Sequence, residues 1–231
     1  MTTIAARLQA VHRRINAAAE SAGRSPQSVR LIAVSKTFPP DAIVKAYAAG
    51  QVAFGENYLQ EALGKMATLS ELRLEWHHIG PIQSNKTRQI AERFDWVHGV
   101  DRLKVAQRLS ISRPASLPPL EVCLQVNVSD EETKSGARPG EILALAKAVC
   151  ALPGIRLRGL MAIPEPTSDP GLQRSRFRQI RDLKDEIVGC GIALDTVSMG
   201  MSDDLEAAIA EGATLVRVGR AIFGERPPYP G

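Results

Sequence analysis

The sequence is poor in aromatic residues, which make up 4% of its 231 positions. Proteins that hold single-stranded nucleic acid use aromatic side chains as stacking platforms and gather cations along one groove. In this chain the net charge is only +4, and the arginines are spread from end to end. We therefore expect no nucleic-acid partner.

Cysteine is scarce as well, because Cys123, Cys150 and Cys190 are the only three and form no CxxC pair. An odd number of widely spaced cysteines argues against a disulfide framework and favours a reducing compartment. The sequence also lacks any uncharged apolar run of about 18 residues, and charged residues such as Arg13 interrupt residues 1–22, where a signal peptide would need an apolar core. We expect a cytoplasmic protein that does not enter a membrane.

What the sequence does contain is a regular alternation of two patterns. Apolar residues recur at helical spacing from Ile4 to Ile15, and Gly23 follows as a stop, so the chain should open with a helix. Eight short β runs and eight helical stretches then alternate. The β runs are 30–35, 52–55, 75–79, 95–98, 119–126, 155–160, 194–197 and 214–218, and the helical stretches are 41–49, 57–71, 85–93, 101–112, 139–151, 172–188, 203–211 and a short one after Arg220.

Eight βα units without a second cluster of strands predict an α/β fold, in which parallel strands close into a single (β/α)8 TIM-type barrel with an extra N-terminal helix. We expect one domain over residues 1–231, because 44% apolar residues suffice for one large core. We also expect a monomer. A doubly wound open sheet is the structural alternative, but its dinucleotide-binding form would need a GxGxxG turn, and residues 36–40 contain no glycine.

Lys36 ends the first buried β run and comes shortly before the breaker pair Pro39-Pro40. At the carboxyl end of a barrel strand, a cation lies at the mouth of the barrel, where reacting groups collect. An amine over a polar pocket with an apolar strand beneath it is the setting for a lysine that forms a Schiff base. Taken alone, a lysine after a strand is more often a solvated end-cap.

The stretch Ser198–Asp204 follows the seventh β run and indicates an anion site. Gly200 permits a tight turn there, and Ser202 is placed to cap a helix running to Ala210. Backbone N–H groups at such a helix start favour a phosphate. The eighth β run ends in Arg217–Arg220, with another glycine before a short helical turn, and barrels often bind phosphate in the loops after strands seven and eight.

These two sites together predict a ligand that has a phosphate at strands seven and eight and an electrophilic carbon near Lys36. A small phosphorylated aromatic aldehyde has both groups. Pyridoxal 5′-phosphate fits this description. Because the first and last strands of a closed barrel are neighbours, Arg217 would then face the pyridine nitrogen and keep it unprotonated, which weakens the ring as an electron sink. For Arg217, the structural alternative is an ion pair with Glu56, Asp203 or Glu206.

Five motifs run in order along nearly the whole chain, and together they resemble one known family. They are Leu31–Thr37, Phe54–Tyr58, Trp76–Lys86, Gly159–Pro164 and Ser198–Asp204. The family is that of the pyridoxal phosphate homeostasis proteins. The resemblance implies a barrel similar to the amino-terminal domain of alanine racemase, with pyridoxal 5′-phosphate bound as an aldimine to Lys36.

The candidate cofactor-binding residues are Lys36, Asn57, Gly200, Ser202, Arg217, Gly219 and Arg220. The resemblance implies that Asn57 lies near the ring and Arg217 at the ring nitrogen. It implies that Ser202, Gly219 and residue 220 lie at the phosphate. The family pattern usually has threonine where this chain has Arg220, so the backbone N–H remains for the phosphate while a hydroxyl contact is lost.

Racemase chemistry would need a second acid/base on the ring face opposite the lysine. The larger racemases similar to this barrel take that group from an additional carboxyl-terminal domain, whereas this chain stops at Gly231, and of its tyrosines only Tyr58 could approach a pocket. Our leading hypothesis is a protein, not an enzyme, that buffers or delivers pyridoxal phosphate in vitamin B6 homeostasis, with apo-enzymes as candidate partners. The alternatives are a weak racemase or transaminase and, more distantly, a lysine-dependent aldolase acting on a sugar phosphate.

Three further residues have chemistry that the cofactor hypothesis does not use. His77 and His78 should point to opposite sides of a short strand, one into the barrel and one towards the helices. Without other metal ligands nearby, each is expected to be a hydrogen-bonded core histidine. Lys134 lies in the most polar loop of the chain, where ion pairing within the loop is a better interpretation than a second aldehyde site.

Overall fold

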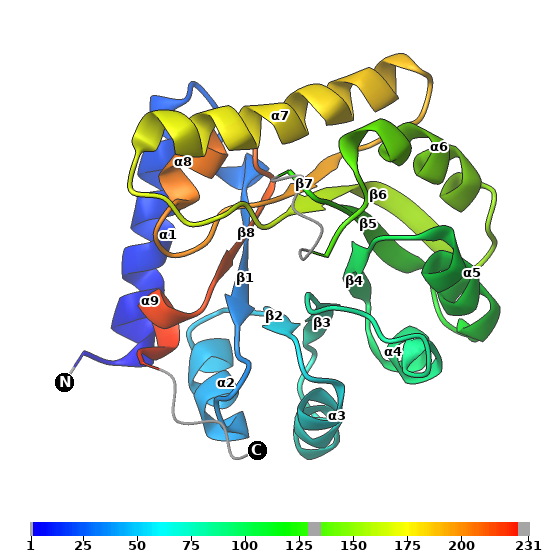
Figure 1. Ribbon diagram of the computed structural model, residues 1–231. Helices are drawn as coiled ribbons and strands as arrows, with labels where there is room; N and C mark the ends of the chain where they lie inside the picture. The colour runs from blue at the N-terminus through cyan, green and yellow to red at the C-terminus, as the bar shows by residue number, and fades with distance from the viewer. Residues whose placement is uncertain (1, 129–134, 226–231) are drawn as a thin grey trace.

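A computed structural model gives the fold and describes residues 2–128 and 135–225. After a first helix, strands and helices alternate along the chain, as the sequence predicts (Figure 1). The strands are β1 (Arg30–Val34), β2 (Ala53–Glu56), β3 (Glu75–His78), β4 (Trp96–Val100), β5 (Leu120–Val126), β6 (Ile155–Ala162), β7 (Thr196–Ser198) and β8 (Leu215–Val218). The helices are α1 (Ile4–Ser21), α2 (Pro40–Ala48), α3 (Leu59–Thr68), α4 (Thr87–Arg93), α5 (Leu103–Ser112), α6 (Pro139–Cys150), α7 (Pro170–Gly189), α8 (Leu205–Ala210) and α9 (Arg220–Phe223), with a short 3-10 turn at Pro26–Ser28.

The eight strands form one closed barrel in chain order. Each strand pairs in parallel with the next, and β1 pairs with β8 in a register that runs from Arg30 opposite Leu215 to Ala33 opposite Val218. The helices surround the barrel because each parallel crossover leaves its helix outside the sheet (Figure 1). The predicted TIM-type barrel is confirmed, and the open-sheet alternative is wrong.

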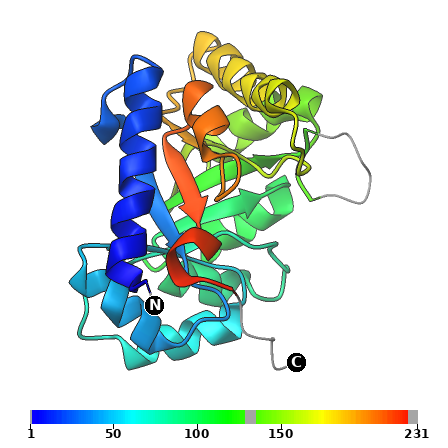
Figure 2. The ribbon, with the colours of Figure 1, turned by 90° about the vertical axis from the view of Figure 1, so that its left-hand side faces the viewer.

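The extra helix α1 covers the seam where the barrel closes. It lies along α8 and α9 and also contacts α2 (Figures 1 and 2). One face of α1 is buried through Leu8, Val11, Ile15 and Ala19, as the apolar spacing predicts. Beyond the helix, Arg24 donates hydrogen bonds to the carbonyls of residues 209 and 213 at the end of α8.

Apolar side chains fill two separate regions. The larger region lies between strands and helices and includes the fully buried Phe54, Phe94 and Phe177. The smaller one lies inside the barrel and consists of Ile32, Trp96, Cys123, Met161 and Leu215. Cys123 is therefore a core thiol, and burial raises its pKa to about 12. Polar side chains share the barrel interior with this cluster, since His77 stacks on Trp96.

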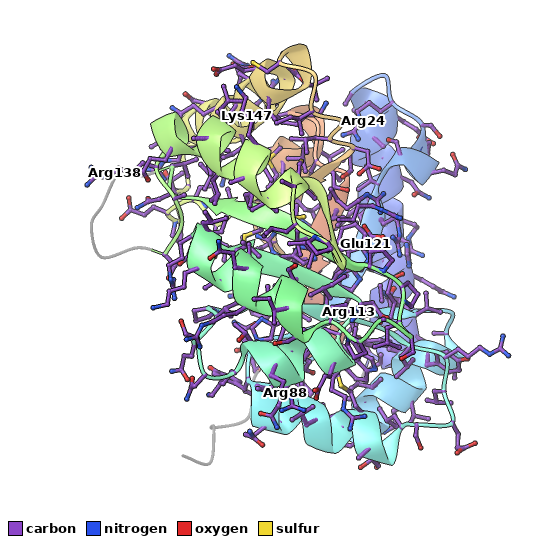
Figure 3. The ribbon with its side chains drawn as sticks, turned by 90° about the vertical axis from the view of Figure 1, so that its right-hand side faces the viewer. Arg24, Arg88, Arg113, Glu121, Arg138 and Lys147 are labelled. Atoms are coloured by element: carbon purple, nitrogen blue, oxygen red, sulfur yellow. The ribbon has the colours of Figure 1, made fainter. Side chains whose placement is uncertain are left out.

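The outer helices are joined to one another by polar contacts as well as by packing. Figure 3 views the barrel from the side covered by α4, α5 and α6. Arg113, directly after α5, donates to the carbonyl oxygens of Ala91 and Phe94 at the end of α4. These carbonyls lack partners within the helix, so the guanidinium completes the helix end. Within the described ranges, no helix is long and apolar enough to span a bilayer.

Gly159 marks a close approach of two neighbouring strands. It pairs with Thr196 of β7, and a Cβ atom at residue 159 would lie 1.7 Å from the Thr196 carbonyl oxygen. Gly159→Ala would force β6 and β7 apart. Because overpacking a rigid site is costly, we expect the free energy of unfolding in urea to fall by about 3 kcal/mol or more.

Gly140→Ala is the matched control for this substitution. Residue 140 lies in α6, and no atom lies within 4 Å of a Cβ atom placed there. Alanine favours a helix over glycine, so this variant should be as stable as the parent or more stable. Equal losses of stability in the two variants would contradict the conclusion that β6 and β7 approach too closely at Gly159 for a side chain.

Candidate functional site

The carboxyl ends of the strands surround a cavity of about 230 Å³. Its walls come from the ends of β1, β2, β3 and β8 and from the segments that follow β6 and β7. Of the predicted cofactor residues, those that line it are Lys36, Asn57, Ser202, Arg217, Gly219 and Arg220. Residues from both ends of the sequence therefore meet at one mouth of the barrel.

Gly200 supports the cavity without being part of its lining. It has a φ of +92°, and a Cβ atom at this position would lie 2.6 Å from the Cβ of Ala208. Its carbonyl accepts a hydrogen bond from the backbone N–H of Arg217, at 2.9 Å. Glycine is needed here because the turn has a left-handed conformation and packs directly on α8.

The turn after β7 is built differently from the prediction. α8 begins only at Leu205, and its N-cap residue is Asp204, so Ser202 does not cap the helix. The carboxylate of Asp204 instead accepts a hydrogen bond from the backbone N–H of Met201, at 2.6 Å. This bond closes a turn before the helix, which delays the helix start and leaves the Ser202 side chain at the cavity.

The N-terminal helix also holds this turn. Arg14 of α1 donates to the carbonyl oxygen of Ser202, at 3.0 Å, and pairs with Glu206. The sequence contains no motif that predicts this contact, since residues 14 and 202 meet only because α1 packs across the barrel seam.

Lys36 lies in a short loop between β1 and α2 whose backbone is fixed on both sides. Ser35 donates its N–H to the Gly55 carbonyl, and its carbonyl accepts from the Phe38 N–H. Thr37 has a φ of +68°, a left-handed conformation that is costly for a β-branched residue. Its N–H donates to Glu61 of α3, at 2.6 Å, which helps to hold the unusual conformation.

A buried cluster of charged residues behind this loop holds its backbone in place. The Lys65 ammonium donates to the Ser35 carbonyl at 2.7 Å, to Glu56 at 2.6 Å and to Glu61 at 2.5 Å. Ser35 also donates its hydroxyl to Glu56, at 2.6 Å. Burial raises the pKa of Glu56, although the charge of Lys65 opposes this effect. We call Lys65, Glu56 and Glu61 the outer brace.

Arg217 lies on β8 with its side chain buried at the floor of the cavity. One terminal nitrogen donates to the Ser198 hydroxyl at 2.6 Å, and the other donates to the Ala162 carbonyl at 2.9 Å. Burial lowers its pKa to about 10, so the guanidinium remains charged at neutral pH. Among the described residues, its other N–H groups have no partner.

The predicted ion-pair alternatives for Arg217 are wrong, because each acid is already paired with another cation. Glu56 belongs to the outer brace, and Glu206 pairs with Arg14. Asp203 pairs with Arg220, at 2.8 Å, on the exposed rim. The Arg220 guanidinium is thus directed to a neighbouring carboxylate, while its backbone begins α9 directly after Gly219.

Asn57 contributes a polar group that lacks a partner. Its side-chain Oδ1 atom is buried without a hydrogen bond among the described residues. Gly80 packs so closely on it that a Cβ atom at residue 80 would lie 2.7 Å from the Asn57 carbonyl. A buried acceptor at a cavity wall is costly unless a ligand or solvent answers it.

The two adjacent histidines point to opposite sides of β3, as predicted. His77 stacks on Trp96 inside the barrel and is hydrogen-bonded through both ring nitrogens. His78 packs edge-on against Phe94 in the outer core. The expectation of a hydrogen-bonded core histidine is not met at Nδ1 of His78, because this atom is buried without a partner in the described part of the chain. Lys134 lies outside the described residues.

Part of the cavity wall was not predicted. The loop between β6 and α7 contributes Ile163, Pro166 and Thr167, and α7 contributes Gln173, which donates to the Thr167 carbonyl at 2.7 Å. No motif identifies these residues. Only their position after a β run could have indicated a role in the site, since loops at the carboxyl ends of barrel strands commonly build the site. Tyr58 is exposed and is not among the lining residues.

Comparison with known proteins gives the class to which this barrel belongs. The family model described as alanine racemase, N-terminal domain, matches residues 6–227. A solved structure of PipY from Synechococcus elongatus with pyridoxal phosphate bound is 39% identical, with a TM-score of 0.85 over 96% of this chain and 100% of that chain. The barrel is therefore of the alanine racemase N-terminal type.

Two curated relatives define the family of this chain more specifically. Pyridoxal phosphate homeostasis protein of Pseudomonas aeruginosa is 62% identical over 226 residues, covering 98% of this chain and 97% of the relative. The protein of the same name from Escherichia coli K12 is 52% identical over 232 residues, covering 98% of each. The chain belongs to the pyridoxal phosphate homeostasis protein family, as its motifs predict.

Lys65→Met tests the outer brace. The substitution leaves the buried Glu56 carboxylate without its cation, and breaking a buried pair in this way costs about 3–5 kcal/mol. We expect a loss of this size in the free energy of unfolding at pH 7, measured in urea. Because the raised pKa of Glu56 rises further without Lys65, the carboxylate takes up a proton as the pH falls, and the loss should shrink.

Two variants make this test specific. Lys45→Met removes an exposed lysine of α2 and should change stability by about 0.5 kcal/mol or less. Combining Lys65→Met with Glu56→Gln removes the stranded charge and should restore part of the lost stability. A double variant that is no more stable than Lys65→Met would contradict the assigned role of the ion pair.

Proposed function

We propose that the chain binds pyridoxal 5′-phosphate in the cavity at the carboxyl ends of the strands and serves intracellular vitamin B6 homeostasis. The observation that carries the proposal is the meeting of three different groups in one cavity: the Lys36 side chain, the Arg217 guanidinium and the turn at Ser202. The names of the close relatives and the cofactor in PipY support it. On this proposal, residues 1–231 act as one cofactor-binding unit.

The polar groups of the cavity fit those of the cofactor. Arg217 has N–H groups without a partner among the described residues, which suits a ring nitrogen that acts as an acceptor. The buried Oδ1 atom of Asn57 also lacks a partner, and it suits a donor on or near the ring. Ser202 offers a hydroxyl, and Gly219 and Arg220 offer backbone N–H groups at the start of a helical turn, which suit a phosphate.

When bound, the cofactor supplies an aldehyde that reacts with amines and a ring that can withdraw electrons. Lys36 would provide the amine for a reversible covalent bond to that aldehyde. Arg217 would donate to the ring nitrogen and, being charged, would disfavour a proton there. Such a contact holds the ring in place while limiting its capacity for amino-acid chemistry.

We therefore propose a carrier, not an enzyme, which buffers the cofactor or delivers it to apo-enzymes. Of the described lining residues, Asp203 and Asp204 carry the carboxyl groups, and both are engaged: Asp203 pairs with Arg220, and Asp204 accepts from Met201. Because both carboxylates are engaged, this arrangement favours binding of the cofactor over transfer of protons to and from a substrate. We further propose a monomer in the cytoplasm, where the free thiols of the three cysteines would be stable.

Lys36→Ala tests the covalent contact. Borohydride treatment of the parent protein loaded with pyridoxal phosphate should give an adduct that maps to Lys36 by mass spectrometry. The variant should lose this adduct and keep its fold, because residue 36 lies in a loop at the cavity rather than in the core. Lys45→Ala, at an exposed position of α2, should retain the full adduct. Adduct formed mainly at another lysine of the parent protein would refute the assignment.

A turnover measurement tests the carrier proposal. Loaded protein is mixed with single enantiomers of alanine and other amino acids, and the products are followed by chiral chromatography. We expect no change in chirality and no keto acid beyond that formed by the free cofactor. In parallel, an apo-enzyme that requires pyridoxal phosphate should regain activity when loaded protein is added. Catalytic turnover by the parent that is lost in Lys36→Ala would overturn the proposal.

A further inference from the structure

A second polar network fills the barrel interior beneath the cavity. It links five buried or partly buried groups in an unbroken line, and we call it the interior chain. Its members are Glu75, His77, His98, Ser198 and Arg217. They come from β3, β4, β7 and β8, so the line crosses the barrel from its amino-terminal rim to the floor of the cavity.

The contacts along the interior chain are all of hydrogen-bond length. A carboxylate oxygen of Glu75 lies 2.6 Å from Nε2 of His77. Nδ1 of His77 lies 3.0 Å from Nε2 of His98. Nδ1 of His98 lies 2.8 Å from the hydroxyl of Ser198, which in turn lies 2.6 Å from Arg217. Among the described residues, the buried side-chain polar atoms of Glu75, His77, His98 and Ser198 all have a hydrogen-bond partner.

The two ends of the interior chain fix the direction of every hydrogen bond in it. Arg217 can only donate, so the Ser198 oxygen accepts from it, but a hydroxyl oxygen can accept twice and this contact alone leaves the Ser198 proton free. The Glu75 carboxylate at the other end can only accept, so two neutral rings must each donate towards Glu75. The Ser198 proton then points to Nδ1 of His98. That nitrogen must then be bare, which places the proton of neutral His98 on Nε2. From there His98 donates to His77.

The remaining bonds follow in the same way. His77 accepts at Nδ1 and therefore carries its proton on Nε2, from which it donates to Glu75. A carboxylate can only accept, so the sequence of bonds ends there. The opposite direction would present a bare His77 nitrogen to the Glu75 carboxylate, two acceptors 2.6 Å apart. One arrangement of protons therefore satisfies every contact along the interior chain.

The electrostatics agree with this arrangement. Burial lowers the pKa of His77 and lowers that of His98 well below its ordinary value, so both rings are neutral at pH 7. Burial alone would raise the pKa of Glu75, but the hydrogen bond from His77 and the charge of Arg30 outweigh it and keep the carboxyl ionised. Arg30 pairs with Glu75 at 2.8 Å on the rim.

We propose that the interior chain positions Arg217 for the cofactor, with Ser198 as the positioning residue in direct contact with it. Ser198 is fully buried and is held by His98 on one side. It thereby occupies one terminal nitrogen of the guanidinium, and the Ala162 carbonyl occupies the other. The rotation of the planar group is fixed, and its remaining N–H groups face the position proposed for the ring nitrogen. This inference rests on the proposed function.

The first experiment determines the protonation of the two histidines of the interior chain, without any cofactor. The sequence contains only four histidines, so long-range ¹H–¹⁵N spectra of their rings can be assigned by single substitutions. In the parent protein at pH 7, His77 and His98 should both be neutral with the proton on Nε2. A proton on Nδ1 of His98, or a charged ring at either position, would overturn the inferred direction.

The second experiment compares two ligands. Pyridoxal 5′-phosphate has a ring nitrogen, whereas its 1-deaza analogue has a C–H group in the same place. Ser198→Ala should raise the dissociation constant of pyridoxal phosphate by about tenfold, because a contact to a charged donor is misaligned. The same variant should change the constant of the deaza analogue by less than about twofold, since that ligand cannot accept from Arg217.

Ser110→Ala is the matched control, because Ser110 is a buried serine of α5 that donates to the Pro153 carbonyl away from the cavity. It should leave both constants unchanged. Equal weakening of both ligands by Ser198→Ala, or no weakening of either, would overturn the positioning role. Failure of the parent to bind pyridoxal phosphate would instead refute the proposed function, and the histidine spectra would still show whether the interior chain exists.

Discussion

The hydrogen-bonded pairing of β1 with β8 is the contact on which the site depends. It places Ile32 opposite Arg217 and thereby joins the strand that leads to Lys36 with the strand that carries the guanidinium. These residues lie near opposite ends of the chain. The helix α1 packs across the outside of this seam, where Arg14 holds the turn at Ser202. The additional helix is thus part of the support of the site as well as of the fold.

Two polar networks hold the principal groups of the site from opposite sides of the barrel wall. The outer brace fixes the loop around Lys36 from the helix side, and the interior chain reaches Arg217 from within. Both bury charged groups, which is tolerated only where partners replace the lost water. The outer brace and the interior chain together determine where the Lys36 amine and the Arg217 guanidinium lie. Few residues are therefore needed in the cavity lining itself.

The fold was predictable because alternation of β runs with helical stretches leaves few topologies, and eight such units favour a closed barrel. The residues Lys36, Arg217 and Ser202 were predictable because strand ends and glycine turns collect at one mouth. The predicted cap at Ser202 was wrong, because Asp204 closes a turn through Met201 before α8 begins. Local sequence does not distinguish these two uses of neighbouring polar residues.

The sequence by itself determined the order of the elements, the apolar faces and the family to which the chain belongs, because these depend on spacing and on short motifs. Only the tertiary structure decided which charges are paired. Glu56 meets Lys65, Asp203 meets Arg220, and a histidine of β4 links one of β3 to a serine of β7. These pairings depend on barrel closure and strand register, which bring together residues that no local pattern relates.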